Sequence, residues 1–143
     1  MTLTPEEQEQ RREFMRGAMT KTPYIASLGV EVERWGDDGV TIRLPFDPEL
    51  TNDGAVYHGG AVASLMDTAG AAAVWAGHDF DKGTRAATVS MTINYTGAVM
   101  RADLLAEAVC VKRGRELAFS EIRVHDPGGK PVATGTLVYR IVP

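Results

Sequence analysis

The stretch Asn52–Gly77, NDGAVYHGGAVASLMDTAGAAAVWAG, decides how the rest of this chain folds. From Gly60 to Ala76 nearly every residue is small or apolar, and the apolar residues lie on all sides rather than along one stripe. A helix with this pattern is enclosed by protein. The sequence therefore predicts a central helix that the other elements must cover.

One charged residue, Asp67, lies near the middle of this helix. A carboxylate inside an apolar helix costs free energy unless it is hydrogen-bonded, paired or used in chemistry. Just before the helix, His58-Gly59-Gly60 can bring backbone N–H groups at a helix N-terminus close to a ligand, because glycine has no side chain in the way. The sequence predicts a polarising site and a buried carboxylate about two turns apart on one rigid element.

Composition narrows the possible functions. A chain of 143 residues with 44% hydrophobic content fits one domain with a single core. Fifteen Lys and Arg against 19 Asp and Glu give a net charge of -4, so we expect no general attraction to nucleic acid or to an anionic membrane. The single cysteine, Cys110, excludes a disulfide framework and a Cys-based zinc site. With no signal-peptide pattern or convincing membrane span, we expect a cytoplasmic protein.

The sequence before the central helix predicts an arm and a hairpin. Thr4-Pro5-Glu6-Glu7 is a capping-box pattern that opens a polar helix to about Met19. Its apolar patch is short, so we expect residues 1–24 to form an N-terminal helical arm that lies on a surface. From Ile25 onward, apolar residues alternate with small or polar ones on both sides of a turn at 36–39, which predicts two paired strands.

Four more alternating stretches follow the helix, at 87–95, 104–110, 118–124 and 133–141, and the last three are joined by tight turns. This order has no βαβ alternation. It predicts an α+β fold over residues 25–143, in which a curved antiparallel sheet of about six strands wraps around one long helix. The three strands joined by tight turns should be neighbours.

The order of elements and one motif resemble a known family. Asn-x5-His-Gly-Gly opens a helix that carries Asp nine residues after the His, which resembles the hotdog-fold acyl-CoA thioesterases of the PaaI-like branch. The resemblance covers about Ile25 to Ile141, and it implies hydrolysis of aryl or fatty acyl-CoA thioesters by a homodimer or homotetramer. It implies no cofactor and no metal, since coenzyme A is part of the substrate. The most specific matches are Asn52, Gly54, His58, Gly59, Gly60 and Asp67.

Thioester hydrolysis needs a polarised carbonyl and an activated water or nucleophile. The Gly59 N–H, with Gly60 beside it, can bind the carbonyl oxygen at the positive helix end. Asp67 can act as general base or attack directly to form an anhydride, and the sequence leaves both routes open. Asn52 can orient the water, and His58 fits a role in supporting the turn. By resemblance, Ser90 on the following strand would help to hold the water or the carboxylate across a dimer interface.

A protein that binds coenzyme A also needs side chains that bind its phosphates. Lys112, Arg113 and Arg115 cluster at one tight turn, where their charges can meet phosphate groups, and Arg101 could contribute. The simpler interpretations are a solvated hairpin end for this turn and a structural hydrogen-bonded carboxylate for Asp67. Other functions consistent with the sequence are an acyl-CoA binding or sensing module without turnover and an acyl-thioester hydratase or dehydratase of the same fold. Open sheet edges predict a homodimer with sites between subunits.

Overall fold

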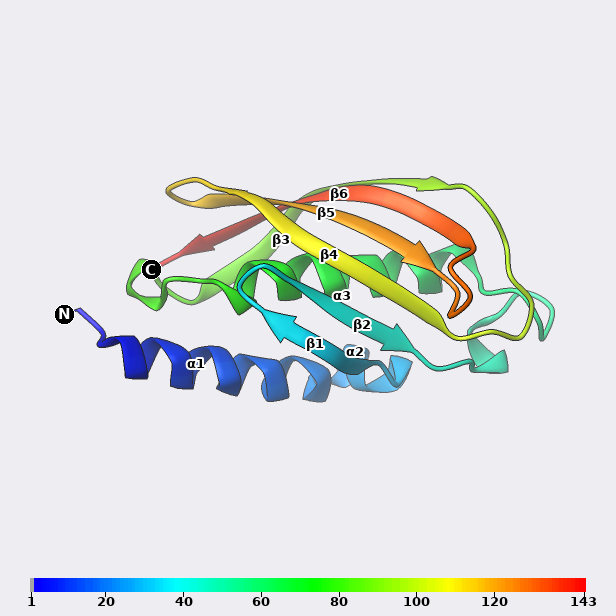
Figure 1. The fold of residues 1–143 in the computed structure, drawn as a ribbon, viewed down its shortest axis with the longest axis horizontal. Coiled ribbons are helices and arrows are strands. Elements are labelled where there is room, and N and C mark those ends of the chain that lie inside the picture. The colour runs from blue at the N-terminus through cyan, green and yellow to red at the C-terminus, as the bar shows by residue number, and fades with distance from the viewer. Residues whose placement is uncertain (1) are drawn as a thin grey trace.

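The computed structural model describes residues 2–143 and contains the predicted order of strands and helix (Figure 1). Two strands precede the long helix α3, and four strands follow it. This confirms the α+β class and the number of strands. The bounds are β1 (Glu31–Gly36), β2 (Gly39–Leu44), α3 (Gly59–Ala76), β3 (Arg85–Tyr95), β4 (Leu104–Arg113), β5 (Leu117–His125) and β6 (Pro131–Val142).

The strands form one antiparallel sheet in the order β1-β2-β4-β5-β6-β3. The pairing of β1 with β2 and of β4, β5 and β6 in sequence confirms the two hairpin predictions. Strand β3 follows α3 directly but pairs with β6, at the far edge of the sheet. The edges are therefore β1, with six residues, and β3, with eleven.

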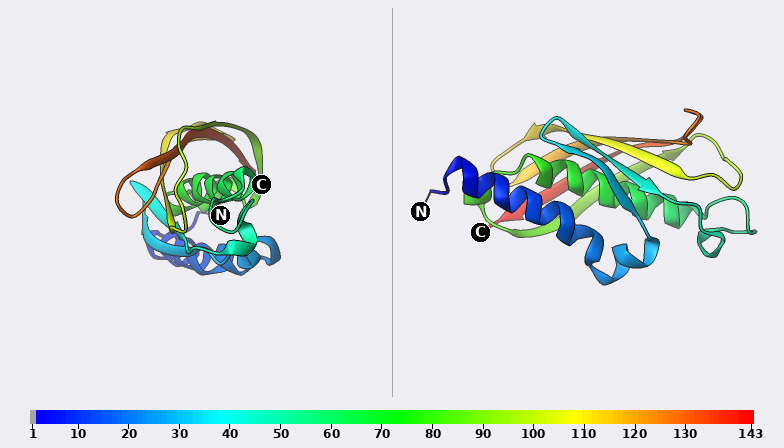
Figure 2. Two further views of the ribbon diagram at one scale, coloured as in Figure 1. Left: turned by 90° about the vertical axis from the view of Figure 1, so that its right-hand side faces the viewer. Right: turned by 60° about the horizontal axis from the view of Figure 1, so that its bottom comes forward.

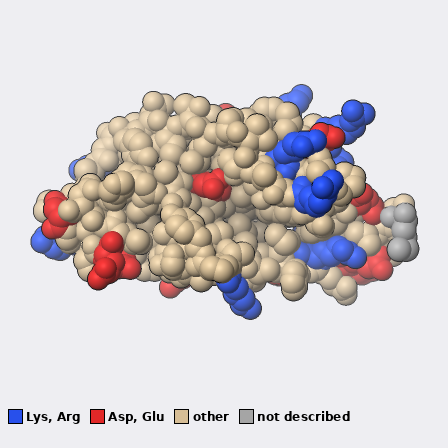
Figure 3. Space-filling model, turned by 180° about the vertical axis from the view of Figure 1, so that it is seen from behind, with Lys and Arg blue, Asp and Glu red and all other residues tan. Residues whose placement is uncertain are grey.

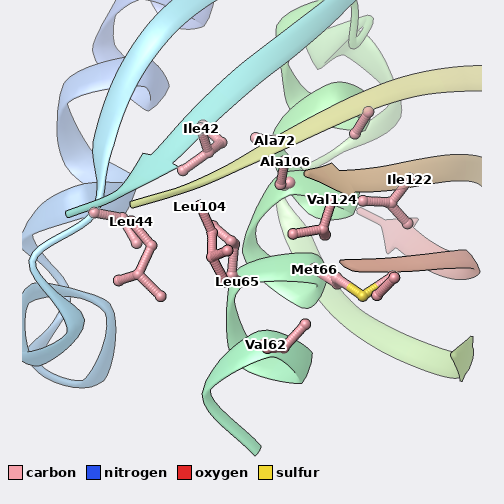
Figure 4. Packing of buried hydrophobic residues seen from close by; sticks show 14 of the residues in the cluster. Ile42, Leu44, Val62, Leu65, Met66, Ala72, Leu104, Ala106, Ile122 and Val124 are labelled. Carbon is pink, nitrogen blue, oxygen red and sulfur yellow. The ribbon is translucent and has the colours of Figure 1, made fainter. Parts of the chain in front are cut away.

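The sheet curves around α3, as the end-on view in Figure 2 shows. Leu65 and Met66 of α3 are fully buried and face the strands, where they join Leu104 and Ile122 in one core (Figure 4). At Gly70 a Cβ would lie 3.1 Å from the Leu137 side chain, so any larger residue would require Leu137 to shift. The enclosed helix predicted from the sequence is confirmed for this side of α3.

The N-terminal segment differs from the prediction at one point. Helix α1 (Pro5–Ala18) begins with the predicted capping box, and η1 (Met19–Lys21) follows it. The predicted strand start at Ile25 is wrong, because α2 (Pro23–Leu28) is a helix that ends at Gly29 with φ 76°. Pro23 at the first helical position favours this start, and a glycine in the left-handed region favours this end.

The arm is docked by polar contacts as well as by its apolar patch. Gln8 donates from Nε2 to Asp79 Oδ1 at 2.9 Å, and its Oε1 accepts from the Phe80 N–H at 2.9 Å. Arg12 Nε donates to the His78 carbonyl at 3.1 Å. Met19, 7% exposed, belongs to the main core. In Figure 2, α1 covers the side of α3 that faces away from the sheet.

Candidate active site

The start of α3 presents a backbone donor at a positive helix end. His58 is the N-cap, and its Nδ1 accepts the Gly60 N–H at 2.7 Å, so the neutral ring carries its proton on Nε2. His58 thus supports the turn. Within residues 2–143 the Gly59 N–H has no hydrogen-bond partner, while the Gly59 carbonyl accepts the Tyr95 hydroxyl at 2.8 Å. This peptide is held in place with its N–H free to bind a carbonyl oxygen or an anion.

Asn52 lies in the loop that leads into α3. Its backbone N–H donates to the Val56 carbonyl at 3.0 Å, and its exposed side chain makes no hydrogen bond among the described residues. Asp53 Oδ1 accepts the backbone N–H groups of Val56 and Ala55, which lowers the pKa of this carboxyl. Gly54, at φ 90°, adopts a turn conformation that favours glycine. The loop is thus fixed by its own bonds and leaves the Asn52 amide free.

Asp67 points from α3 toward the β3 edge of the sheet, beside the N-terminal arm. The sequence predicted a buried carboxylate, and this is corrected: Asp67 is partly exposed, because it borders an open pocket of about 550 Å³. Its Oδ1 accepts the Thr88 hydroxyl of β3 at 2.7 Å. Within the described chain Oδ2 has no donor. One oxygen is therefore anchored, and the other is available to a water molecule or a substrate carbon.

A β-bulge explains why Thr88 makes this contact. The register of β3 against β6 shifts between Thr88 and Ser90, so the alternation of faces breaks at Val89. Thr88 faces the helix, whereas Ser90, paired with Val138, makes no hydrogen bond to Asp67 in this chain. Strict alternation along residues 87–95 would place both hydroxyls on one face of the strand. Simple alternation carries no sign of the bulge, so Thr88 was missed.

The pocket beside Asp67 lies between α3 and the N-terminal arm. On the helix it runs past Asp67, Ala71 and Trp75, and Tyr139 of β6 closes part of it. Burial raises the pKa of Tyr139, and the nearby charge of Asp67 also raises it. The sequence gives no sign that the arm lines this pocket, because the apolar residues of the arm are few. The arm contributes Met15, Ala18, Met19, Thr22 and Tyr24, and Ile25 of α2 follows them.

The basic turn lies at the other end of α3. Arg113 donates from Nη1 to the Val74 carbonyl at 2.9 Å and from Nη2 to the Ala73 carbonyl at 3.2 Å, so it caps the C-terminus of the helix. Lys112 and Arg115 are exposed and form no ion pair among residues 2–143. Figure 3 views the molecule from behind relative to Figure 1. It shows Lys and Arg side chains gathered at one end of that face, the end where Figure 1 places both termini.

One chain does not bring all the predicted site residues together. Asp67 lies eight positions after Gly59, which corresponds to about 12 Å along a helix. The turn at 112–115 lies farther away still, at the opposite end of α3 from Gly59. Arg101, with φ 48°, instead lies near the helix start, where its N–H donates to the Ala55 carbonyl.

Neither a membrane-spanning helix nor a metal-binding cluster is found in the part of the chain that the structure describes. None of the helices within 2–143 has both the length and the apolar character needed to cross a membrane. In the same residues no group of three or more His, Cys, Asp or Glu side chains is placed to hold a metal ion. The candidate site combines the Gly59 N–H, the Asn52 amide, the Asp67 carboxylate and the adjoining pocket.

Comparisons with known proteins agree with this architecture. The model of the thioesterase superfamily matches residues 54–133, more than half of the chain. An inferred esterase of Halobacterium salinarum is 34% identical over 117 residues, which are 80% of this chain and 77% of that protein. A conserved protein of Pseudomonas aeruginosa has a similar structure, with a TM-score of 0.76, 32% identity and coverage of 87% and 97% of the two chains.

A third comparison concerns a hypothetical thioesterase of Streptococcus pneumoniae whose structure was solved with coenzyme A. It aligns with a TM-score of 0.67 and 22% identity, over 79% of this chain and 85% of the other, which is a likeness of fold. The family model and the 34% identical relative identify the family as well as the fold. This chain belongs to the thioesterase superfamily of thioester hydrolases and has its hotdog fold.

Proposed function

We propose that this protein hydrolyses acyl-CoA thioesters to a free acid and coenzyme A, as a member of the PaaI-like branch. The observation that best supports the proposal is the environment of the two carboxylate oxygens of Asp67. Thr88 holds one oxygen at 2.7 Å, and the other faces a pocket of about 550 Å³. A carboxylate fixed in this way can take a proton from water, or it can attack the thioester carbon itself. A protein that only binds acyl-CoA needs no such group.

The oxyanion that forms during hydrolysis requires a fixed donor. The Gly59 N–H meets this need, because it lies at the positive end of an eighteen-residue helix and is unpaired within residues 2–143. The Asn52 amide is free to bind the attacking water. His58 holds the turn through Gly60 and takes no part in proton transfer.

The catalytic groups of one chain are too far apart to act on one thioester. A separation of about 12 Å along α3 exceeds hydrogen-bond reach several times over. We therefore place Gly59 and Asn52 of one subunit opposite Asp67 of another, in a homodimer formed by antiparallel pairing of the open β3 edges. Two such dimers would assemble into a homotetramer.

Coenzyme A would bind with its phosphates near the basic turn. Lys112 and Arg115 are exposed and free of ion pairs in the described chain, whereas Arg113 is held by the end of α3. The similar fold solved with coenzyme A supports a ligand of this class. Arg113 then contributes mainly by fixing the turn from which Lys112 and Arg115 project.

The test is thiol release from a panel of aryl-, medium- and long-chain acyl-CoAs. Asp67→Asn keeps the shape of the side chain but removes its basicity, so we expect kcat to fall by about 10²- to 10⁴-fold. Asp37→Asn, in the exposed turn between β1 and β2, is the matched control and should keep wild-type activity. Binding without cleavage above the Asp67→Asn rate would instead indicate a binding or sensing module. Hydration of an enoyl-CoA without thiol release would indicate a hydratase.

A further inference from the structure

We propose that the N-terminal arm forms one wall of a slot for an apolar acyl group of medium length, and that Met15 sets the length limit. This inference rests on the proposed thioesterase function. It concerns the part of the pocket that extends away from Asp67, toward the C-terminus of α3.

The pocket follows α3 from the carboxylate toward the end of the helix. Asp67, Ala71 and Trp75 are spaced four residues apart and therefore lie on one face. Trp75 lies eight positions after Asp67, about 12 Å along the helix, which an extended chain of on the order of eight to ten carbon–carbon bonds would span. The slot thus begins at the reacting carboxylate and continues along a largely apolar path.

Aromatic residues close the base of the slot. Trp75, 5% exposed, donates from Nε1 to the Tyr139 hydroxyl at 3.2 Å and packs against Phe80, with ring centroids 5.7 Å apart. These rings belong to a second buried cluster, against which Met15 of the arm also packs. A long acyl chain cannot pass through this cluster without displacing it.

Met15 separates the slot from another hollow. Met15 and Thr84 line both the pocket at Asp67 and a neighbouring hollow of about 600 Å³, which also reaches Phe14 and Phe80. Methionine is flexible and fills irregular gaps, so this partition depends on one adaptable side chain. Truncation of Met15 would join the two hollows and lengthen the slot.

The size of the slot favours a medium-length acyl group over an acetyl or a long fatty acyl group. An engineered cavity of about 150 Å³ accommodates benzene, and the pocket here holds about 550 Å³. Each methylene buried in the slot should improve kcat/KM by about fourfold. This gain should stop at the chain length that reaches Trp75 and Met15.

A hydrogen bond fixes the arm over the open end of the slot. The Tyr24 hydroxyl and Ser64 Oγ lie 2.7 Å apart, and Ser64 Oγ also lies 2.9 Å from the Gly60 carbonyl. The carbonyl can only accept, so Ser64 donates to it and Tyr24 donates to Ser64. Together with the contacts of Gln8 and Arg12, this bond holds the arm at both ends of the slot.

The experiment measures kcat/KM for a series of straight-chain acyl-CoAs from two to sixteen carbons. Wild type should have its maximum at about ten carbons, the length that spans the slot. Met15→Ala should raise the ratio of dodecanoyl-CoA to octanoyl-CoA by at least about sixteenfold, the value of two further buried methylenes. Ala71→Leu should lower activity on octanoyl-CoA by at least about tenfold and leave butanoyl-CoA within about threefold. Phe14→Ala, on the same helix but outside the slot, is the control and should keep the wild-type profile.

The outcomes separate this inference from the proposed function. Cleavage of acyl-CoAs with the same chain-length profile in wild type, Met15→Ala and Ala71→Leu overturns the slot and leaves the thioesterase function intact. If wild type cleaves none of them, the function fails, and the slot is tested by calorimetric titration with octanoate and dodecanoate. Tighter binding of dodecanoate to Met15→Ala than to wild type supports the slot in that case, and unchanged binding overturns it.

Discussion

Thr88 on β3 donates its hydroxyl hydrogen to Asp67 on α3, with 2.7 Å between Oγ1 and Oδ1. This contact links the edge strand of the sheet to the only charged side chain of the central helix. It leaves Asp67 with one oxygen oriented and one free. A change at the edge strand can therefore alter the carboxylate without removing it.

Thr88→Val removes this hydroxyl and keeps the shape of the side chain. The charged carboxylate loses a fixed partner, and a hydrogen bond to a charged group is worth about 1.5–3 kcal/mol. We expect kcat to fall by about tenfold or more, with a small effect on thermal stability because Thr88 is exposed. Thr88→Ser restores the donor and should recover most of kcat. Steady-state thiol release measures both, and wild-type kcat in Thr88→Val would show that this contact does not orient the carboxylate.

The sequence was sufficient to predict the central helix, the six strands and the hairpins, because strict alternation and an all-round apolar helix are strong local signals. The identity of the hydroxyl beside Asp67 was not predictable. One residue inserted at Val89 reverses which side chains of β3 face the helix, and this shift exists only in the pairing with β6. Ser90 therefore remains a prediction that concerns a second subunit.

Two further features could not be predicted from the local sequence pattern. The residues of helix α2 from Ile25 onward were predicted to be a strand, because periodicity over six residues does not distinguish a helix from a strand. The role of Arg113 at the end of α3 depends on residues 39 and 40 positions earlier in the chain. From the sequence, Arg113 was indistinguishable from its neighbours Lys112 and Arg115.

We expect the three cations of the basic turn to have different roles. Arg113 should stabilise the fold, and Lys112 and Arg115 should bind the substrate. Arg113→Ala removes two hydrogen bonds from the carbonyls that end α3, so we expect the free energy of unfolding to fall by about 1–3 kcal/mol. The double variant Lys112→Ala, Arg115→Ala should keep its stability and instead raise KM for acyl-CoA, with a weaker dependence of KM on salt. Urea denaturation and kinetics at two salt concentrations distinguish them. Equal KM effects of all three residues without loss of stability would contradict this division.

His78 should make stability depend on pH. Its side chain is 4% exposed, and burial lowers the pKa of the imidazole, with the charge of Arg113 acting in the same direction. Nε2 lies 2.9 Å from the Gly83 carbonyl and donates to it in the neutral ring. The unfolded chain, with a pKa near 6.5, then binds more protons than the folded chain once the pH falls below that value. The stability that the neutral, buried His78 contributes is therefore present in full above about pH 6.5. It is lost as the pH falls toward the lowered pKa.

We therefore expect the free energy of unfolding to decrease from pH 7 to pH 5, and His78→Gln to flatten this part of the curve. Urea denaturation at half-unit steps of pH measures the slope. His78→Gln also loses packing against Trp75 and Phe80, so its stability should be lower at every pH. The slope, not the absolute stability, is the relevant quantity. An unchanged slope in the variant would assign the pH dependence to other groups.

The last prediction concerns the β3 edge. Val89 is 56% exposed near the middle of this strand, so antiparallel pairing of two β3 strands about their centres would bring Val89 of each chain close to the other. Val89→Lys would place two like charges there and should convert dimers to monomers, as measured by light scattering. Activity should fall with the dimer, because Gly59 and Asp67 of one chain are about 12 Å apart and cannot share a thioester. Val109→Lys, 44% exposed on β4 inside the sheet, adds the same charge away from the edge and should keep both the dimer and activity. A fully active monomer would show that one chain completes the site alone.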